Sequence, residues 1–213
     1  MHLASSPAFK NGNYPQAIRD GFLTSDRSFL ELAEKKSYKE GSCCIVAIWL
    51  RDLNRLYISN LGDSRAVICR KGRAIPLSRD HRPTTESEKK RIIELGGAIP
   101  ATGRLFNLLS VSRALGNVDF KKGPISGLLT AEPEITELNL TSDDYFLLMA
   151  SDGFWDVFSN EEAIVMTVRL FSKYSVYNLG RVTKELVREA TVRGSTDDIT
   201  VLLLLLQKPN PPQ

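Results

Sequence analysis

The chain has 213 residues, with 28 basic and 25 acidic side chains and a formal net charge of +3, a size that suits one large domain or two small ones with a buried core. Its charges are spread along the whole length, and its longest apolar run is far shorter than a membrane span, so neither a nucleic-acid-binding arm nor a membrane partner is indicated. The three cysteines form no CxxC pair, which argues against a disulfide framework or a zinc knuckle and favours a reducing compartment.

The first predicted helix begins at Asn13, which is a good N-cap, and Pro15 is pre-set for the first turn. Ile18 and Phe22 then fall on one face, as the helical period requires. We expect this helix to extend to about residue 36, with Gly21 as the position where it could break.

A β region follows the first helix. Segments 43–50, 55–60 and 66–70 are rich in Ile, Val, Leu and Tyr and are separated by turn residues. Lys71-Gly72 then turns into a fourth short strand. These four segments predict one antiparallel meander.

Helices dominate the later chain. Segments 85–88 and 159–162 both have the capping-box spacing, and the first of these helices should end at Gly96-Gly97. A third helix is expected at 179–192, with Val182, Leu186 and Ala190 on one stripe and Gly194 after its end. The last strand is expected at 199–206. Strands at both ends of the core region, with helices between them, predict an α+β fold.

Two acidic positions lie at the ends of apolar strands. Asp152 follows the continuously apolar segment 145–150, and Asp197 stands just before the equally apolar last strand. Strand ends are rigid mounts, so these two carboxylates could face one cleft. Asp156 lies one turn of chain beyond Asp152, and Asp80 lies in a loop between a strand and a capped helix.

Aspartate is also common in turns and caps, so each acid has a structural interpretation. For Asp63, Asp143 and Asp144 we prefer that interpretation. For Asp152 and Asp197 the local sequence leaves the two interpretations about even. The pairing of these acids with buried strands, and the shortage of basic residues within their motifs, favours ion binding.

An all-oxygen ligand set prefers Mg²⁺ or Mn²⁺ over Zn²⁺, and His2 and His81 are the chain's two histidines. No cysteine is followed by arginine at the spacing of a phosphate-cradling loop, and no GxxxxGK[ST] occurs. Hydrolysis of a phosphate ester by metal-bound water remains, in which two ions ~3.5–4 Å apart orient the ester.

Five short motifs, taken in their order along the chain, are specific enough to indicate a protein family. They are GDSRAV at 62–67, DHRP at 80–83, SRALG at 112–116, SDGFWD at 151–156 and DDITV at 197–201. Together they resemble the metal-dependent protein phosphatase family, PP2C. The resemblance implies an αββα sandwich of antiparallel sheets flanked by helices, with a binuclear Mg²⁺ or Mn²⁺ centre. It also implies hydrolysis of phosphoserine and phosphothreonine in phosphoprotein substrates.

Carried over by position, the resemblance makes Asp152 and Asp197 ligands of the two catalytic ions. Asp80 and Asp156, with Asp152 shared, match the ligands of a third, weaker ion. Arg113 is expected to support the cleft without performing chemistry. No catalytic side chain beyond the metal ligands, and no further cofactor site, is expected.

Structural roles are expected for four further residues of these motifs. Phe154 and Trp155 should pack beneath the site, while Asp63 and Arg65 should hold a turn between strands. We expect residues 1–208 to form one phosphatase domain and residues 209–213 to form a loose tail. The protein is expected to be a monomer. It is expected in the cytoplasm and/or nucleus, because no sorting signal stands out.

Two departures from the family pattern matter. Family members carry an Asp-Gly-His-Gly motif that bridges both metals, but neither Asp-Gly pair of this chain is followed by His, and Asn117 replaces the usual Asp. We therefore expect a domain truncated at its N-terminus, which lacks its first strands and is weakly active or inactive. The alternative is a catalytically inactive module that binds phosphoproteins or regulates a partner.

Overall fold

The computed structural model describes residues 3–122 and 126–206. The chain divides into two compact units, which are described separately. Unit 1 comprises residues 1–46, 59–63 and 80–135, and unit 2 comprises residues 47–58, 64–79 and 136–213. The tail expected at 209–213 lies outside the described residues.

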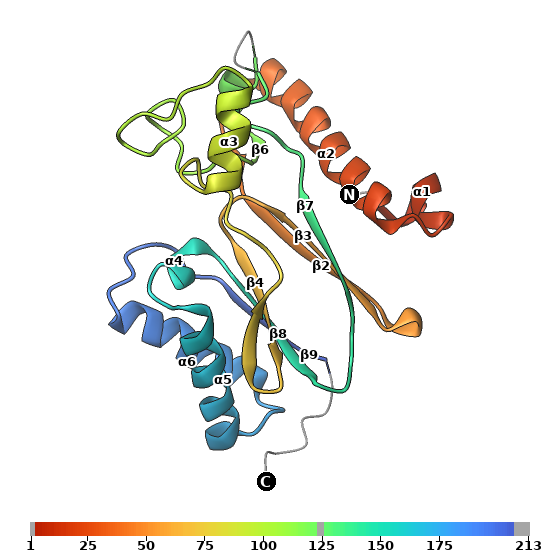
Figure 1. Ribbon diagram of the computed structural model, residues 1–213, viewed down its shortest axis with the longest axis vertical. Coiled ribbons are helices and arrows are strands. Elements are labelled where there is room, and N and C mark those ends of the chain that lie inside the picture. The colour runs from red at the N-terminus through yellow and green to blue at the C-terminus, as the bar shows by residue number, and fades with distance from the viewer. Residues whose placement is uncertain (1–2, 123–125, 207–213) are drawn as a thin grey trace. The chain divides into compact units, whose positions relative to one another are not determined.

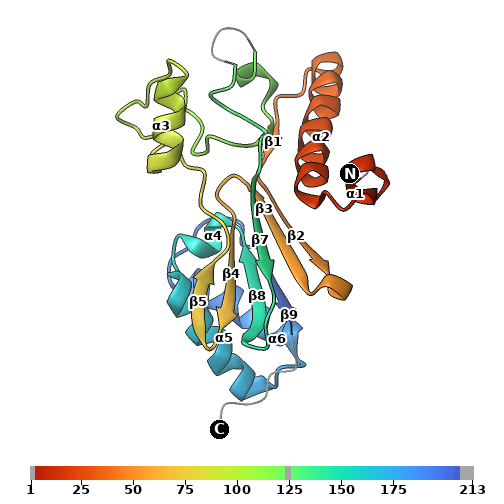
Figure 2. The same ribbon diagram turned by 45° about the vertical axis from the view of Figure 1, so that its right-hand side comes forward.

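Unit 1 begins with short turns, η1 (Leu3–Ser5) and α1 (Pro7–Lys10), followed by the long helix α2 (Tyr14–Lys36). The predicted cap is confirmed, because the Asn13 side chain accepts a hydrogen bond from the Gln16 amide. The predicted stripe is also confirmed, since Ile18 and Phe22 are buried. The break suggested at Gly21 is wrong, and Figure 2 shows α2 as one continuous helix. Burial of this stripe outweighs the ~1 kcal/mol helix penalty of one glycine.

The rest of unit 1 contains α3 (Glu86–Glu94), η3 (Val118–Phe120) and a two-stranded sheet of β1 (Gly41–Ser42) and β6 (Leu115–Gly116). Asn117 follows β6 with a left-handed backbone, φ 56°, which asparagine tolerates well. A Cβ at Gly41 would lie 1.7 Å from Asn117 Oδ1. The Asn117 side chain therefore lies against the Gly41 backbone, and a larger residue at position 41 would require that side chain to move.

The remaining strands belong to two sheets. One sheet has the order β2-β3-β7, from β2 (Cys44–Leu50), β3 (Arg55–Leu61) and β7 (Glu134–Asn139), with η2 (Arg51–Leu53) after β2. The other has the order β5-β4-β8-β9, from β4 (Arg65–Arg70), β5 (Arg73–Pro76), β8 (Asp144–Ala150) and β9 (Val201–Leu205). Strands β2, β3, β4, β5, β8 and β9 lie close to the predicted segments, whereas β7 was not predicted, and the single meander is wrong. The central residues of β4 are buried, so it needs a neighbour on each side and pairs with β5 and β8.

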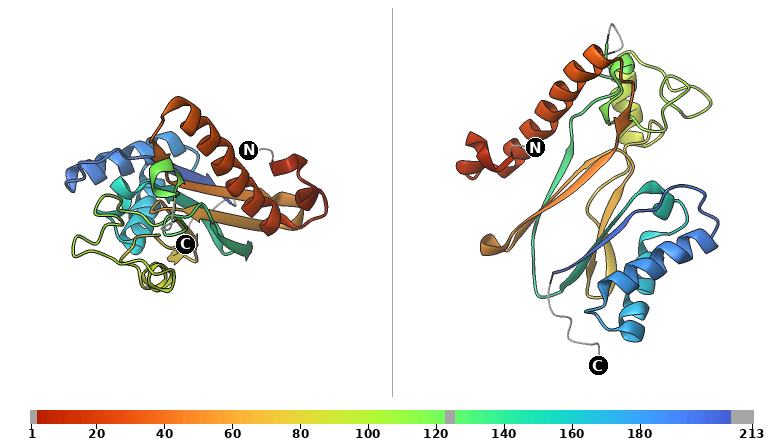
Figure 3. Two further views of the ribbon diagram at one scale, coloured as in Figure 1. Left: turned by 90° about the horizontal axis from the view of Figure 1, so that it is seen from above. Right: turned by 180° about the vertical axis from the view of Figure 1, so that it is seen from behind.

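Unit 2 is built on this four-stranded antiparallel sheet. Its centre is the β4/β8 pair, and β8 also pairs with β9 in the register Ala150 to Val201. Helices α5 (Asn160–Tyr174) and α6 (Leu179–Val192) cover one face of the sheet, as Figure 1 and the right-hand view of Figure 3 show. Alternate sheet residues such as Phe146 and Leu148 pack against these helices, so the core lies between sheet and helices.

The helices of unit 2 confirm the sequence analysis closely. The capping box of α5 is present, with Ser159 and Glu162 bonded in both directions, and α6 has its predicted limits and buries the predicted stripe. The α+β class, with antiparallel sheets flanked by helices, is confirmed. Among the described residues, no helix has the length and apolarity required to cross a membrane.

We predict that Leu186→Ala destabilises the chain by about 2–5 kcal/mol, because it leaves a cavity in a fully buried position of α6. Urea denaturation measures the change. Val192→Ala is the matched control, since Val192 lies on the same helix with 72% of its surface exposed, and it should change stability by less than about 0.5 kcal/mol. Equal losses in the two variants would contradict the core described here.

Candidate active site

Asp152 lies in a tight turn directly after β8. Ser151 is the N-cap of the short helix α4 (Asp152–Trp155). The Asp152 carboxylate accepts a hydrogen bond from the Gly153 amide at 3.0 Å, and the Asp152 carbonyl accepts one from the Asp156 amide at 2.8 Å. Asp152 and Asp156 are thus held by one turn of helix.

Asp197 lies in the segment that leads into β9, and hydrogen bonds join this segment to the Asp152 turn. The Ser151 hydroxyl donates to the Asp198 carbonyl at 3.1 Å and accepts from the Thr200 amide at 3.0 Å. The Ser195 hydroxyl donates to the Gly153 carbonyl at 2.6 Å. The antiparallel pairing of β8 with β9 therefore continues beyond the strands as side-chain bonds.

The two acidic segments are in close contact. A Cβ added to Gly153 would lie 2.7 Å from the Asp198 carbonyl oxygen and 3.2 Å from the Asp197 Cβ. Such approach is possible only with glycine at position 153. The structure thus places Asp152 and Asp197 on adjacent backbone segments of unit 2, while their role as metal ligands stays a prediction.

An aromatic layer supports this turn. Phe154 is fully buried and stacks on Phe158 with ring centroids 4.5 Å apart. The Trp155 indole N–H donates to the carbonyls of both Arg65 and Ala150, each at 3.1 Å. The indole thereby ties the end of β8 to the start of β4. The prediction that both aromatic residues are packed is confirmed.

Asp80 belongs to unit 1, in a loop that the next residue fixes. The His81 amide donates to the Gly62 carbonyl at 2.9 Å, and the Gly62 amide donates to His81 Nδ1 at 3.2 Å. The Ser112 amide and hydroxyl both donate to the His81 carbonyl. Four hydrogen bonds, three to its backbone and one to its imidazole, therefore hold His81 beside Asp80.

This role of His81 was not predicted from the sequence. Burial, helped by the charge of Arg113, lowers the pKa of His81 to about 4, so the imidazole is neutral at physiological pH. A neutral imidazole can accept the Gly62 hydrogen bond at Nδ1. The DHRP motif contains this histidine, but its hydrogen-bond partners Gly62 and Ser112 are distant in the chain and could not be predicted from local sequence.

Glu88 is the centre of a buried ionic cluster in unit 1. Its carboxylate accepts hydrogen bonds from Arg113, Arg91 and the Ser112 hydroxyl, at distances between 2.5 and 3.1 Å. Burial alone would raise the pKa of Glu88, but these hydrogen bonds outweigh it and lower the pKa to about 2. The capping box expected at 85–88 is wrong, because Glu88 is recruited by these arginines and Thr85 makes no side-chain cap.

Arg113 therefore has a structural role, as expected. Besides Glu88, it donates to the Glu132 carbonyl at 3.0 Å. Through Ser112, which binds both Glu88 and the His81 carbonyl, the cluster is continuous with the loop that carries Asp80.

The acids assigned to turns have stronger partners than expected. Asp144 does accept the turn bond from the Thr141 amide, but it is fully buried and also paired with Arg70 at 2.7 Å. Burial would raise the pKa of Asp144, and the hydrogen bond from Arg70 reverses this and lowers it. Asp63 is 4% exposed and lies 3.4 Å from both Cys43 Sγ and Arg82 Nε.

Asp152 and Asp197 lie on adjacent segments, and carboxylates of this kind suit part of the ligand set of a hard divalent ion. Within residues 3–122 and 126–206, no group of three His, Cys, Asp or Glu side chains is arranged to hold a metal ion.

The fold and these acidic motifs define the class of protein, and comparison with known proteins identifies the family. The family model for protein phosphatase 2C matches residues 1–199. The chain therefore belongs to the protein phosphatase 2C family.

Relatives and solved structures agree with this membership. The chain is 40% identical to protein phosphatase 2C homolog 2 of Aspergillus fumigatus over 83% of its length and 42% of the relative's. It is also 40% identical to probable protein phosphatase 2C 59 of Arabidopsis thaliana, over 88% of this chain and 57% of the relative. The chain thus spans roughly half the length of these curated relatives.

Two solved structures share the fold. A C. elegans sex determining protein superposes with a TM-score of 0.81 at 27% identity, covering 90% of this chain and 46% of that one. The serine-threonine phosphatase 2C of Toxoplasma gondii gives a TM-score of 0.78 at 21% identity, over 95% and 76% of the two chains. The second likeness shows the fold alone.

We predict that Gly153→Ala destabilises the chain by about 1–3 kcal/mol, because the new methyl group would overlap the Asp198 carbonyl. Gly180→Ala is the matched control, since nothing lies within 4 Å of a Cβ at this position of α6. That variant should be neutral or gain up to about 1 kcal/mol. Thermal and urea unfolding decide between them, and a neutral Gly153→Ala would show that the two segments are not in contact.

We predict that Glu88→Gln lowers stability at pH 7 by about 3–5 kcal/mol, because it leaves two arginines without their carboxylate. In the folded protein the pKa of Glu88 is about 2, below the ordinary value of 4.5. The contribution of the Glu88 carboxylate to the free energy of unfolding is therefore complete above pH 4.5 and is lost as the pH falls toward 2. Urea unfolding from pH 7 to pH 2 should therefore show a smaller loss of stability in the variant. If the variant lost as much stability as the wild type between pH 7 and pH 2, the pairing of Glu88 with the arginines would be contradicted.

Proposed function

We propose that this chain forms part of a metal-dependent protein phosphatase that hydrolyses phosphoserine and phosphothreonine. The observation that carries the proposal is the close approach of the Asp152 and Asp197 segments at one end of the β8/β9 pair. Two carboxylates in this position offer the oxygen ligands that Mg²⁺ and Mn²⁺ prefer. Membership of the protein phosphatase 2C family supports the same chemistry.

Each acid has a proposed role. Asp152 and Asp197 would hold two catalytic ions, and Asp156 and Asp80 would contribute, with Asp152, to a weaker third ion. Bound ions of this kind orient a phosphate ester and lower the pKa of a bound water. Support comes from the serine hydrogen bonds that join the two segments and from the Trp155 indole, which donates to the Arg65 carbonyl.

We further propose that this chain by itself binds ions weakly and turns over slowly or not at all. Its sequence contains no Asp-Gly-His, the motif that the family resemblance assigns to the bridging ligand. When a carboxylate is removed from a site that holds two cations, the charge of the cations is less well neutralised. The affinity of the site for the two ions therefore falls steeply.

The same missing motif favours a second candidate, a module that binds phosphoproteins without hydrolysing them. The two candidates differ in a phosphothreonine peptide assay. A form of this chain extended to include an Asp-Gly-His-Gly segment should hydrolyse the peptide if the first candidate holds. Binding of the peptide without turnover by that form would support the second.

For the chain itself, we predict weak Mn²⁺ binding in calorimetric titration, which Asp152→Asn and Asp197→Asn abolish. Asp143→Asn is the matched control, because Asp143 lies in the turn before β8 and pairs with Lys71, so Mn²⁺ binding should be retained. Tight binding at two sites would contradict the proposed loss of affinity. Binding unaffected by Asp152→Asn would exclude this acid as a ligand.

For a form that contains Asp-Gly-His-Gly, we predict hydrolysis of a phosphothreonine peptide only when Mn²⁺ or Mg²⁺ is present. Asp152→Asn should lower the turnover at least about 100-fold, and Asp143→Asn should leave it unchanged. Phosphate release is measured with and without EDTA. Turnover that persists in EDTA would overturn the proposed chemistry.

A further inference from the structure

Arg193 stands at the end of α6, where the chain enters the segment that carries Asp197. It is the C-cap residue of that helix. The chain then turns at Gly194, whose φ of 94° suits glycine, and the Ser195 amide donates to the Ala190 carbonyl at 3.1 Å. A short, hydrogen-bonded turn therefore connects Arg193 to Ser195.

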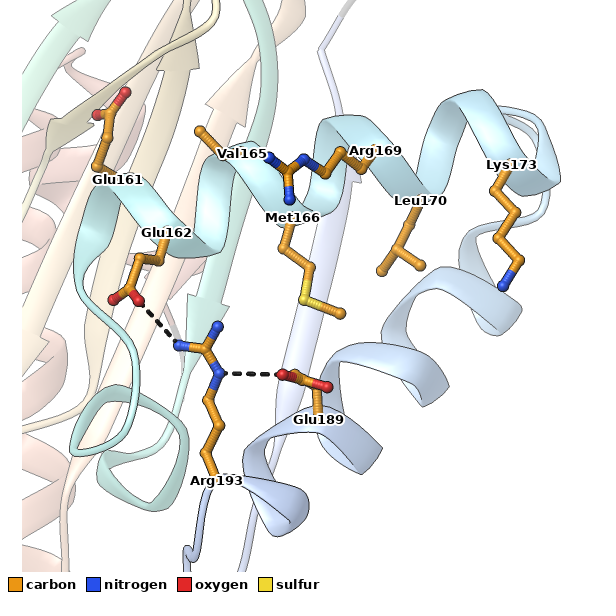
Figure 4. A pocket seen from close by; sticks show the side chains of 9 residues that line it. All are labelled: Glu161, Glu162, Val165, Met166, Arg169, Leu170, Lys173, Glu189 and Arg193. Atoms are coloured by element: carbon orange, nitrogen blue, oxygen red, sulfur yellow. Dashed lines mark hydrogen bonds and ion pairs between the residues drawn. The ribbon is translucent and has the colours of Figure 1, made fainter.

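The Arg193 guanidinium is held by three groups around it. It pairs with Glu162 of α5 at 3.1 Å and with Glu189 of α6 at 3.2 Å. Its central carbon also lies 3.8 Å from the centre of the Phe158 ring. Figure 4 shows the guanidinium between the two carboxylates. Partly exposed ion pairs contribute little energy, but contacts in three directions restrict the orientation of a planar guanidinium.

In this orientation Arg193 also reaches the acidic turn. Its Nη1 donates to the carbonyl of Val157 at 3.2 Å, and Val157 directly follows Asp156. The Phe158 ring beneath the guanidinium stacks on Phe154, which belongs to the same turn. Arg193 thus contacts both the backbone and the aromatic layer of the turn that holds the acids.

Two hydrogen bonds at separate points therefore join the acidic turn to the chain that follows α6. The Ser195 hydroxyl donates to the Gly153 carbonyl at 2.6 Å, and Arg193 donates to the Val157 carbonyl four residues further on. Segments joined at one point can rotate about it, whereas a second point fixes the angle between them. The Arg193 bond extends the junction to the residue next to Asp156.

We propose that Arg193 is a positioning residue that fixes Asp156 relative to the segment of Asp197. It acts through Val157 and Ser195 and does not itself touch a bound ion. Lysine keeps the positive charge, but one ammonium group cannot reproduce a guanidinium fork that bonds in several directions. Only the consequence for ion binding rests on the function proposed above, because the contacts of Arg193 involve the chain alone.

Amide hydrogen exchange followed by NMR tests the positioning without any ion. Arg193→Lys should speed exchange of the Asp156 and Ser195 amides about tenfold more than exchange of the Leu148 amide, because the junction opens locally. Leu148 lies in the middle of the four-stranded sheet, paired on both sides. Arg188→Lys is the matched control, since Arg188 lies on the same helix with a side chain that is 77% exposed, and it should exchange as the wild type does.

Two results of this experiment would overturn the proposal. Equal acceleration of all three amides would show that Arg193 contributes to overall stability without positioning the turn. Wild-type exchange at Asp156 and Ser195 in Arg193→Lys would show that the bond to Val157 does not restrain the turn.

Terbium luminescence tests the consequence for ion binding. Tb³⁺ is a hard ion that emits when an excited indole lies nearby, and its higher charge strengthens its attraction to carboxylates over that of Mn²⁺. The chain has two tryptophans, so Trp49→Phe leaves Trp155, in the acidic turn, as the one sensitiser. In this background Arg193→Lys should weaken Tb³⁺ binding about tenfold or more, and Arg188→Lys should leave it unchanged.

The outcomes separate this proposal from the one on which it builds. Equal Tb³⁺ affinity of Arg193→Lys and Arg188→Lys would overturn the positioning role. Absence of sensitised emission from the chain with an intact Arg193 would count against the ion site itself, and the exchange experiment would then decide the role of Arg193. Circular dichroism checks that each variant is folded.

Discussion

Two serine hydroxyls bind the end of one buried strand to the segment leading into its neighbour. Ser151 bonds across to the β9 side, and Ser195 bonds back to the Gly153 carbonyl. Each serine hydroxyl binds a backbone group that the strand ladder leaves unpaired. Because of these bonds, Asp152 and Asp197 stand on neighbouring segments, and everything proposed for the chemistry of this chain depends on that arrangement.

In unit 1 a different set of hydrogen bonds holds the loop that carries Asp80. The loop of Asp80 is fixed through the backbone of His81 and through Ser112, which is anchored by the ion cluster of Glu88. Replacing such a cluster with apolar residues often costs little, but removing one partner is expensive. The cluster is therefore a source of geometric precision for the loop more than a large net contribution to stability.

The parts of the fold that sequence predicted well are those with local causes. The limits of α6 follow from its apolar period and from Gly194, and the capping box of α5 uses only residues within one turn. The single meander is wrong because β4 pairs with β8, whose residues lie 74 to 85 positions later in the chain. The cap expected at Glu88 is wrong because Glu88 binds an arginine 25 positions away. The candidate acids were recognised from their motifs, whereas the serine bonds that position them required the structure.

The central claim is that Asp152 and Asp197 converge to bind a hard cation. A crystal structure of the chain grown with Mn²⁺, with anomalous scattering recorded to locate the ion, tests it most directly. We predict an anomalous peak in contact with both carboxylates. The account is contradicted if manganese binds elsewhere or not at all, or if the two side chains point to separate surfaces.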